Sequence, residues 1–159
     1  MKIAIVDYEN NNVNELISYL KDEINKKVDD TQAEFVIMGL EKSKRPYLIQ
    51  EIKRFNPDVL ITYNLAGFEL CTLTDSISYN LLDCKQLHWL DKVNCDNESF
   101  LNKVLSIVMF FATEKEEIKK YILGNYDKIP RMYLVNEASS KNENIAKATI
   151  QMMEEAHLV

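Results

Sequence analysis

Short apolar runs alternate along the chain with segments in which apolar residues recur at helical spacing. The first run, at residues 3–6, is followed by an asparagine-rich turn and then by apolar residues at every third or fourth position between Val13 and Ile24. This pattern predicts a strand, a loop and an amphipathic helix. The helix is expected to begin near Asn12, because Asn12 and Glu15 have the spacing of an N-terminal capping pair.

The same order of elements continues through the first part of the chain. Strands are predicted over residues 33–38 and 58–63. Pro46 suits the first turn of the intervening helix, and the pair Asn56-Pro57 ends that helix because a residue before proline avoids the α region. Alternating strands and helices with short connections favour parallel strands joined by right-handed helical crossovers.

The second half of the chain carries further elements of both kinds. A helix is predicted over residues 75–82, a strand over 86–90, a buried central strand over 105–112 and a last strand over 131–135. Capping boxes predict two more helices, at Thr113-x-x-Glu116 and Ser140-x-x-Glu143. The chain has no internal repeat and no linker rich in Gly, Pro or Ser. We therefore expect one α/β domain over residues 1–159, a Rossmann-like or flavodoxin-like three-layer sandwich with a mainly parallel sheet of five to six strands.

The composition is that of a globular protein, and it argues against nucleic acid and membranes as partners. No stretch approaches the roughly 20 apolar residues of a membrane-spanning helix. A formal net charge of −6 argues against nucleic acid and anionic membranes as partners. The short basic stretch of Lys42, Lys44 and Arg45 is interpreted as a solvated connection rather than a phosphate platform.

The cysteines and the N-terminal segment indicate a cytoplasmic protein. Cys71, Cys84 and Cys95 lack the close spacing of zinc sites and disulfide frameworks, so we expect reduced and mostly buried thiols. The first apolar run ends at Asp7, too early for a secretory signal. The Met-rich segment 150–159 is expected to pack into the core, although it would also suit an interface in a homo-oligomer.

The glycines exclude the usual nucleotide-binding loops. There are only three, Gly39, Gly67 and Gly124, and they are far apart in the chain. A dinucleotide fingerprint needs closely spaced glycines after the first strand, where this chain has its asparagine-rich turn. A Walker-type loop is absent as well. No cofactor is therefore assigned, and NAD or FAD binding in the usual mode is not expected.

Ligands of open parallel sheets collect outside the carboxyl ends of the strands. The polar residues that follow the predicted strands are therefore the candidate ligand-binding residues: Asp7, Glu9, Asn10, Asn11, Tyr63, Asn64, Asp91 and Thr113. Their side chains suit hydrogen bonding to a sugar, an amide or a nucleotide base, and the carboxylates would suit a hydroxyl pair or a divalent ion. Asn and Asp are also common turn formers, so the alternative is that these residues only shape the loops.

No catalytic residue and no metal site is assigned. His88 lies in an apolar strand beside Trp89, where a core or edge position is the expected role, and His157 lies at the end of the last helix. No Ser, Cys or carboxylate pair has the spacing of a nucleophile and its base.

Receiver domains have the same strand order and offer one comparison. Asp7 and Glu9 match the acidic residues after their first strand. After the third strand, however, Tyr63 and Asn64 stand where the phosphate-accepting aspartate would be. Only an inactive relative of that family would fit.

Two segments, PDVLITYNLAGF from Pro57 to Phe68 and CKQLHWLD from Cys84 to Asp91, resemble the N-terminal half of glycosyltransferase-B proteins of the spore-maturation type. The likeness covers about residues 57–125. It implies a Rossmann-like fold and an acceptor-side domain of a sugar-transfer system. In that family the nucleotide-sugar donor is held mainly by a second, C-terminal domain, so the resemblance implies a non-catalytic role for a chain of this length.

The sequence therefore predicts a stand-alone, non-catalytic module that binds a small polar ligand of the sugar or nucleotide type, or a partner protein, at the carboxyl ends of its strands. Two alternatives remain. One is a small enzyme that acts on a nucleotide or sugar without a phosphate loop. The other is a flavodoxin-like or degenerate receiver-like regulatory module.

Overall fold

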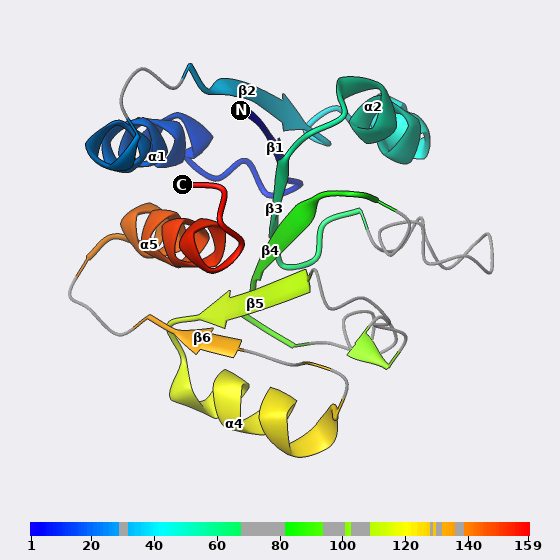
Figure 1. The fold of residues 1–159 in the computed structure, drawn as a ribbon. Helices are drawn as coiled ribbons and strands as arrows, with labels where there is room; N and C mark the ends of the chain where they lie inside the picture. Colours follow the sequence, from blue (N-terminus) through cyan, green and yellow to red (C-terminus); the bar gives the residue numbers. More distant parts are fainter. Residues whose placement is uncertain are drawn as a thin grey trace.

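The chain forms a six-stranded parallel sheet with helices on both faces in a computed structural model (Figure 1). The structure describes residues 1–28, 32–67, 82–93, 101–102, 109–127, 129, 132–135 and 139–159. The strands are β1 (Lys2–Val6), β2 (Glu34–Met38), β3 (Val59–Tyr63), β4 (Lys85–Trp89), β5 (Met109–Thr113) and β6 (Met132–Leu134). The helices are α1 (Val13–Lys27), the 3₁₀ helix η1 (Lys42–Tyr47), α2 (Leu48–Phe55), α4 (Glu116–Asn125) and α5 (Lys141–Glu155).

The strand order across the sheet is β2-β1-β3-β4-β5-β6, and all five pairings are parallel. This confirms the predicted Rossmann-like or flavodoxin-like α/β fold. From β1 the chain moves to one edge of the sheet, and from β3 it moves to the other. The order therefore reverses between β1 and β3, which lie side by side.

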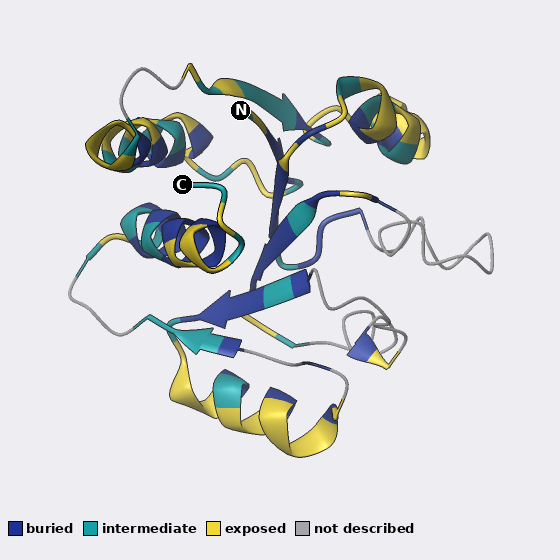
Figure 2. Cartoon of the chain, in the orientation of Figure 1, coloured by how far each residue is buried: buried dark blue, intermediate teal, exposed yellow. Residues whose placement is uncertain are grey.

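The described helices lie on both faces of the sheet (Figure 1). Helices α1 and α5 pack on one face, and α2 and α4 pack on the other. Alternate residues of each strand point to opposite faces: Ile3 and Ile5 contact the α1/α5 core, while Ala4 and Val6 contact the α2/α4 core. Figure 2 shows β3 buried along its whole length and its neighbours β4 and β5 buried at all but one residue each, as expected for a parallel sheet covered on both faces.

The first predicted capping pair is wrong, although its helix begins at the expected place. Helix α1 starts at Val13, but the Asn12 side chain makes no capping hydrogen bond. The Glu15 carboxylate instead accepts a hydrogen bond from Asn142 Nδ2 of α5, at 2.9 Å. A tertiary contact has therefore replaced the local one.

The capping role predicted for Thr113 is also wrong. Thr113 is the last residue of β5, and α4 begins at Glu116 after an N-cap at Lys115 without a side-chain cap. The Thr113 hydroxyl donates to the Leu90 carbonyl oxygen at 2.7 Å and is thereby turned toward the neighbouring strand. The second box is confirmed at its N-cap, where Ser140 Oγ accepts from Glu143 N at 3.2 Å.

The remaining expectations concern Pro46, the helix end at Asn56 and the C-terminal segment. Pro46 lies inside η1, so the α-helix proper begins later, at Leu48. Asn56 ends α2 in a left-handed conformation with φ 52°. Met152 and Met153 of α5 are fully buried, which confirms that the Met-rich segment packs into the core.

Some predictions fall outside the described residues. They are nearly all of the helix at 75–82, the start of the strand at 105–112, and the environments of Cys71 and Cys95. In the described ranges, no helix has the length and apolar character needed to cross a bilayer.

Candidate functional site

The reversal of strand order places the loops after β1 and β3 next to each other at the carboxyl end of the sheet. In doubly wound sheets, the two loops diverge at such a point and leave a crevice in which ligands bind. The predicted site residues lie in these loops, in the loop after β4, and at the ends of β3 and β5. We call this set of loops the rim.

Asp7 shapes the first loop of the rim. Its carboxylate is fully buried and accepts three hydrogen bonds from the loop that follows it: from Glu9 N at 2.8 Å, from Asn11 N at 2.6 Å and from Asn11 Nδ2 at 2.9 Å. Asn10 takes a left-handed conformation, with φ 55°, between these donors. Asp7 therefore positions Glu9 and Asn11 rather than facing solvent itself.

The loop after β3 begins with two consecutive left-handed residues. Asn64 has φ 48° and Leu65 has φ 58°. Asn tolerates this region, but a bulky residue such as Leu is a true outlier there. Leu65 is also 3% exposed, so its side chain is held in the core while its backbone is strained. Strained backbone of this kind persists only where the surrounding structure imposes it, and it concentrates at functional sites.

The Asn64 side chain joins three loops of the rim. Its Nδ2 lies 3.3 Å from both carboxylate oxygens of Glu9, in the β1 loop, and its Oδ1 accepts from Asp91 N, in the β4 loop, at 2.8 Å. The Asn64 backbone N–H donates to the Trp89 carbonyl oxygen at 2.7 Å. These four contacts, together with the tight turn that Ala66 N closes on the Tyr63 carbonyl oxygen at 2.9 Å, hold Asn64 in its left-handed conformation.

Asp91 and Lys141 form the charged part of the rim. Lys141 Nζ lies 2.6 Å from Asp91 Oδ2 and 2.9 Å from Asn11 Oδ1, and it stands over the Tyr63 ring at 5.3 Å. The other oxygen of Asp91 accepts from Trp89 Nε1 at 2.9 Å. Lys141 is the first residue of α5, so the start of this helix closes the rim on the α1/α5 face.

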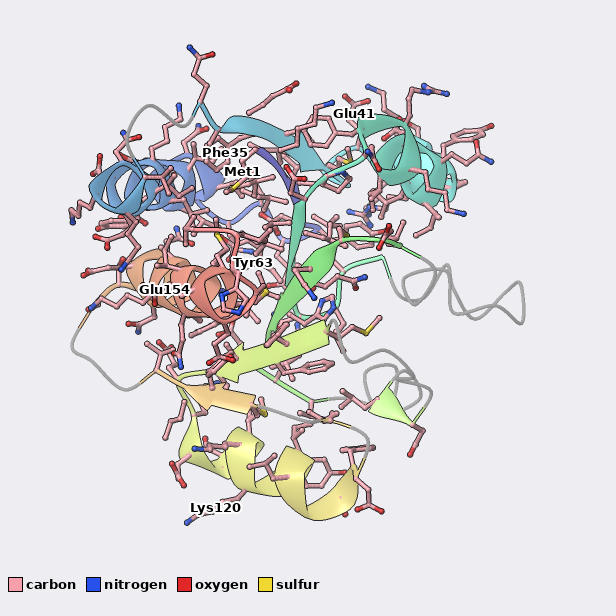
Figure 3. All side chains as sticks on the ribbon, viewed as in Figure 1. Met1, Phe35, Glu41, Tyr63, Lys120 and Glu154 are labelled. Carbon is pink, nitrogen blue, oxygen red and sulfur yellow. The ribbon has the colours of Figure 1, made fainter. Side chains whose placement is uncertain are left out.

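Tyr63, which is labelled in Figure 3, belongs to a buried network under this ion pair. Its hydroxyl donates to Asn142 Oδ1 at 2.7 Å, and Asn142 Nδ2 donates to the Asn12 carbonyl oxygen and to Glu15. Burial, with the nearby carboxylate of Asp7 as a second cause, raises the pKa of the Tyr63 hydroxyl. Tyr63 therefore stays protonated and acts as a donor that fixes α5 against the sheet.

Thr113 lies at the far side of the rim. Its hydroxyl accepts from Lys115 N at 3.1 Å, and Lys115 Nζ reaches back to the Asp91 carbonyl oxygen at 2.7 Å. Thr113 is fully buried, so it orients the β5 loop and does not face solvent.

Two ion pairs of the rim are open to solvent. Their exposed fractions are 40% for Glu9, 58% for Lys92, 31% for Lys141 and 22% for Asp91. Glu9 and Lys92 pair at 3.1 Å, as Lys141 and Asp91 do. The rim thus presents two ion pairs whose groups can exchange partners with a bound molecule.

Sequence reasoning missed part of this site: Lys92, Lys115, Lys141 and Asn142. One signal could have found Lys141 and Asn142. The Ser140 capping box predicts a helix beginning there after the last strand, and such a helix begins at the carboxyl end of the sheet. Their particular partners, Asn11 and Asn12, lie about 130 positions away and carry no such signal.

His88 is a core residue at the centre of the sheet. Its Nε2 lies 3.2 Å from Gln86 Oε1, which only accepts, so this nitrogen carries the proton; Nδ1 then accepts from the Thr62 hydroxyl at 2.8 Å. The ring is fully buried, and burial lowers its pKa to about 3. His88 is therefore neutral and fully bonded, as expected for a core position.

Cys84 lies at the opposite, amino end of the strands. It borders a cavity of about 230 Å³ together with Asn56, Pro57 and Leu82. Burial raises the pKa of its thiol to about 12, so the thiol is protonated and unreactive at neutral pH. A larger cavity of about 370 Å³ lies between Val93, which follows the rim loop of β4, and helix α4.

Neither a metal site nor a similarity to known proteins adds to the description of the rim. Among the described residues, no group of three or more His, Cys, Asp and Glu side chains is placed to hold a metal ion. The chain matches no family model, no curated protein and no solved structure.

Proposed function

We propose that the protein is a non-catalytic binding module that takes a small polar ligand, of the sugar or nucleotide type, at the rim between β1, β3 and β4. The observation that carries this proposal is the strained pair Asn64-Leu65 at the reversal of strand order. Asn64 and Leu65 are the central residues of a tight turn that Ala66 N closes on the Tyr63 carbonyl oxygen at 2.9 Å. Such a turn usually takes Gly or Asn at both central positions, so a leucine there is costly.

The chemistry of the exposed groups supports a polar ligand. The carboxylates of Glu9 and Asp91 can each accept a pair of hydroxyl groups, and the ammonium groups of Lys92 and Lys141 can donate to ligand oxygens. Each group is already paired inside the rim, so binding would exchange bonds rather than bury an unpaired charge. The resemblance of about residues 57–125 to acceptor-side glycosyltransferase halves favours a sugar or nucleotide as the ligand class.

The proposal is tested by native mass spectrometry of the purified protein, followed by titration with UDP-glucose, which carries both a sugar and a nucleotide. Two matched variants, Asn64→Ala and Asn56→Ala, each place alanine in a left-handed position, which should cost each about 1 kcal/mol of folding stability; Asn64→Ala should lose more than Asn56→Ala, because it also removes the bonds to Glu9 and Asp91 N. Only Asn64→Ala should also weaken UDP-glucose binding, by about tenfold, because only Asn64 organises the rim loops.

Three results would contradict the proposal. The first is equal binding by the wild type and Asn64→Ala. The second is a retained protein partner, with no binding of UDP-glucose. The third is turnover of UDP-glucose by the protein alone, which would contradict the non-catalytic role.

A further inference from the structure

An arginine is held in place beside the rim, on the α2/α4 face of the sheet. The guanidinium of Arg45 lies 3.7 Å from the centre of the Tyr8 ring, and its Nε donates to the Gly39 carbonyl oxygen at 2.8 Å. Tyr8 directly follows Asp7 at the end of β1, and Gly39 directly follows β2. Arg45 therefore stands at the carboxyl ends of two neighbouring strands.

Gly39 is required for this arrangement. Its φ is +88°, a region that side chains rarely adopt, and a Cβ at this position would lie 2.6 Å from Tyr8 Cε1. The Tyr8 ring packs directly over the glycine and against the α2/α4 core. The ring and the guanidinium stacked on it are thus held in one place. Arg45 therefore loses little further conformational entropy when it binds a ligand.

The two terminal nitrogens of Arg45 are the atoms with which a guanidinium binds an anion. In the described part of the chain, its two terminal nitrogens have no hydrogen-bond or ion-pair partner, although Arg45 is half-buried. The neighbouring Lys44, by contrast, pairs with Glu41 and is 60% exposed. A guanidinium offers a planar fork of donors that matches the oxygens of a phosphate.

The local charge also favours an anion. Residues 42–54 contain five basic residues and one acidic residue, so this segment carries +4 in a chain whose formal net charge is −6. The rim itself mixes both signs, because Glu9 and Asp91 lie among its lysines. A phosphate would be repelled by these carboxylates and attracted by the basic segment beside them.

We infer that Arg45 is the phosphate-binding residue of the ligand site, so that the ligand is a phosphorylated sugar or a nucleotide. This inference rests on the proposed function. The hydroxyl groups of the ligand face Glu9 and Asp91, and its phosphate lies against the terminal nitrogens of Arg45.

The test compares the full chain with neutral and phosphorylated probes in matched pairs: uridine against UDP, and glucose against glucose 1-phosphate. The phosphorylated member of each pair should bind at least about tenfold more tightly to the wild type, because its phosphate oxygens accept charge-assisted hydrogen bonds from both terminal nitrogens of Arg45. Arg45→Gln should abolish that difference. Arg54→Gln removes the same charge from the exposed surface of α2 and should leave the difference unchanged.

Arg45→Lys covers the case in which Arg45→Gln does not fold. It keeps the charge and loses the fork, so it should lose about fivefold or more of the preference for phosphate. Circular dichroism melting of each variant identifies which one is folded.

The outcomes separate this inference from the proposed function. If neutral and phosphorylated probes bind equally, and Asn64→Ala weakens both, the inference is wrong and the rim site stands. If phosphate preference depends on Arg45 but Asn64→Ala changes nothing, the phosphate site stands and the rim site is wrong. An unchanged preference in a folded Arg45 variant overturns the inference.

Discussion

The two ends of the sheet are closed in different ways. At the carboxyl end, side chains connect loops that are distant in sequence: Asn64 reaches Glu9, and Lys141 reaches both Asn11 and Asp91. Backbone groups extend the parallel ladder at both ends, as when Asp58 N donates to the Lys2 carbonyl oxygen at 2.9 Å and Asp7 N to the Met38 carbonyl oxygen at 3.1 Å. At the amino end, one described side chain, Asp58, accepts from the neighbouring strand, at Lys2 N. Side-chain contacts can be exchanged for a ligand, whereas ladder contacts cannot be exchanged without opening the sheet.

Each end also holds an asparagine in the left-handed region, and the two have different causes. Asn56 ends α2 with its N–H bonded to the Ile52 carbonyl oxygen, which is a common way to terminate a helix. Asn64 is followed by a second left-handed residue, Leu65, and is held by contacts from other loops. The tight turn closed by Ala66 N on the Tyr63 carbonyl oxygen thus holds a leucine where Gly or Asn is usual, and a costly residue of this kind points to function.

The comparison predicts unequal roles for the two aspartates that accept backbone N–H groups. Asp7→Ala should lower the free energy of unfolding by about 3 kcal/mol, because three donors lose a fully buried acceptor. Asp58→Ala removes one exposed bond to Lys2 N, at 2.8 Å, and should cost about 1 kcal/mol. Urea denaturation of both variants measures the difference in the free energy of unfolding. Equal losses would contradict the predicted difference between the two ends of the sheet.

The centre of the sheet provides a pH-dependent prediction. The pKa of His88 is about 3 in the folded protein and 6.5 in the unfolded chain, so the unfolded state binds the proton first as the pH falls. Stability should therefore decrease from about pH 6.5 toward pH 3, with a contribution of up to about 1.4 kcal/mol per pH unit from His88.

Urea denaturation between pH 7 and pH 4 tests this prediction on the wild type and His88→Gln. The variant lacks the titrating ring but keeps every carboxylate of both ends, so its stability should depend less steeply on pH. Parallel pH profiles would show that the acid sensitivity arises at the sheet ends instead.

The smallest expected effects concern two ion pairs of α5. Lys141 pairs with Asp91 at the carboxyl end, and Lys27 pairs with Glu154 at the amino end, where both side chains are more exposed. Lys141→Met should cost about 1 kcal/mol and Lys27→Met at most about 0.5 kcal/mol. Thermal unfolding at low and high salt would measure both, and a larger loss for Lys27→Met would reverse the ranking of the two ends.

Local sequence signals predicted most elements of the fold. Apolar runs and helical spacing identified all six strands and helices α1, α2, α4 and α5, because burial on both faces of a parallel sheet leaves a strong pattern in the sequence. They failed at the capping details of Asn12 and Thr113. There, Glu15 and the Thr113 hydroxyl have partners in other elements, which a local pattern cannot reveal.

The candidate site was likewise predicted only in part from the sequence. The sequence by itself determined that Asp7, Glu9, Asn64 and Asp91 follow strands, and parallel strands bring such residues to one end of the sheet. Only the tertiary structure decided that Asp7 is buried within its loop, that Lys141 completes the rim, and that Arg45 lies on Tyr8. The physical reason is that these contacts depend on strand order and helix placement, which join residues far apart in the chain.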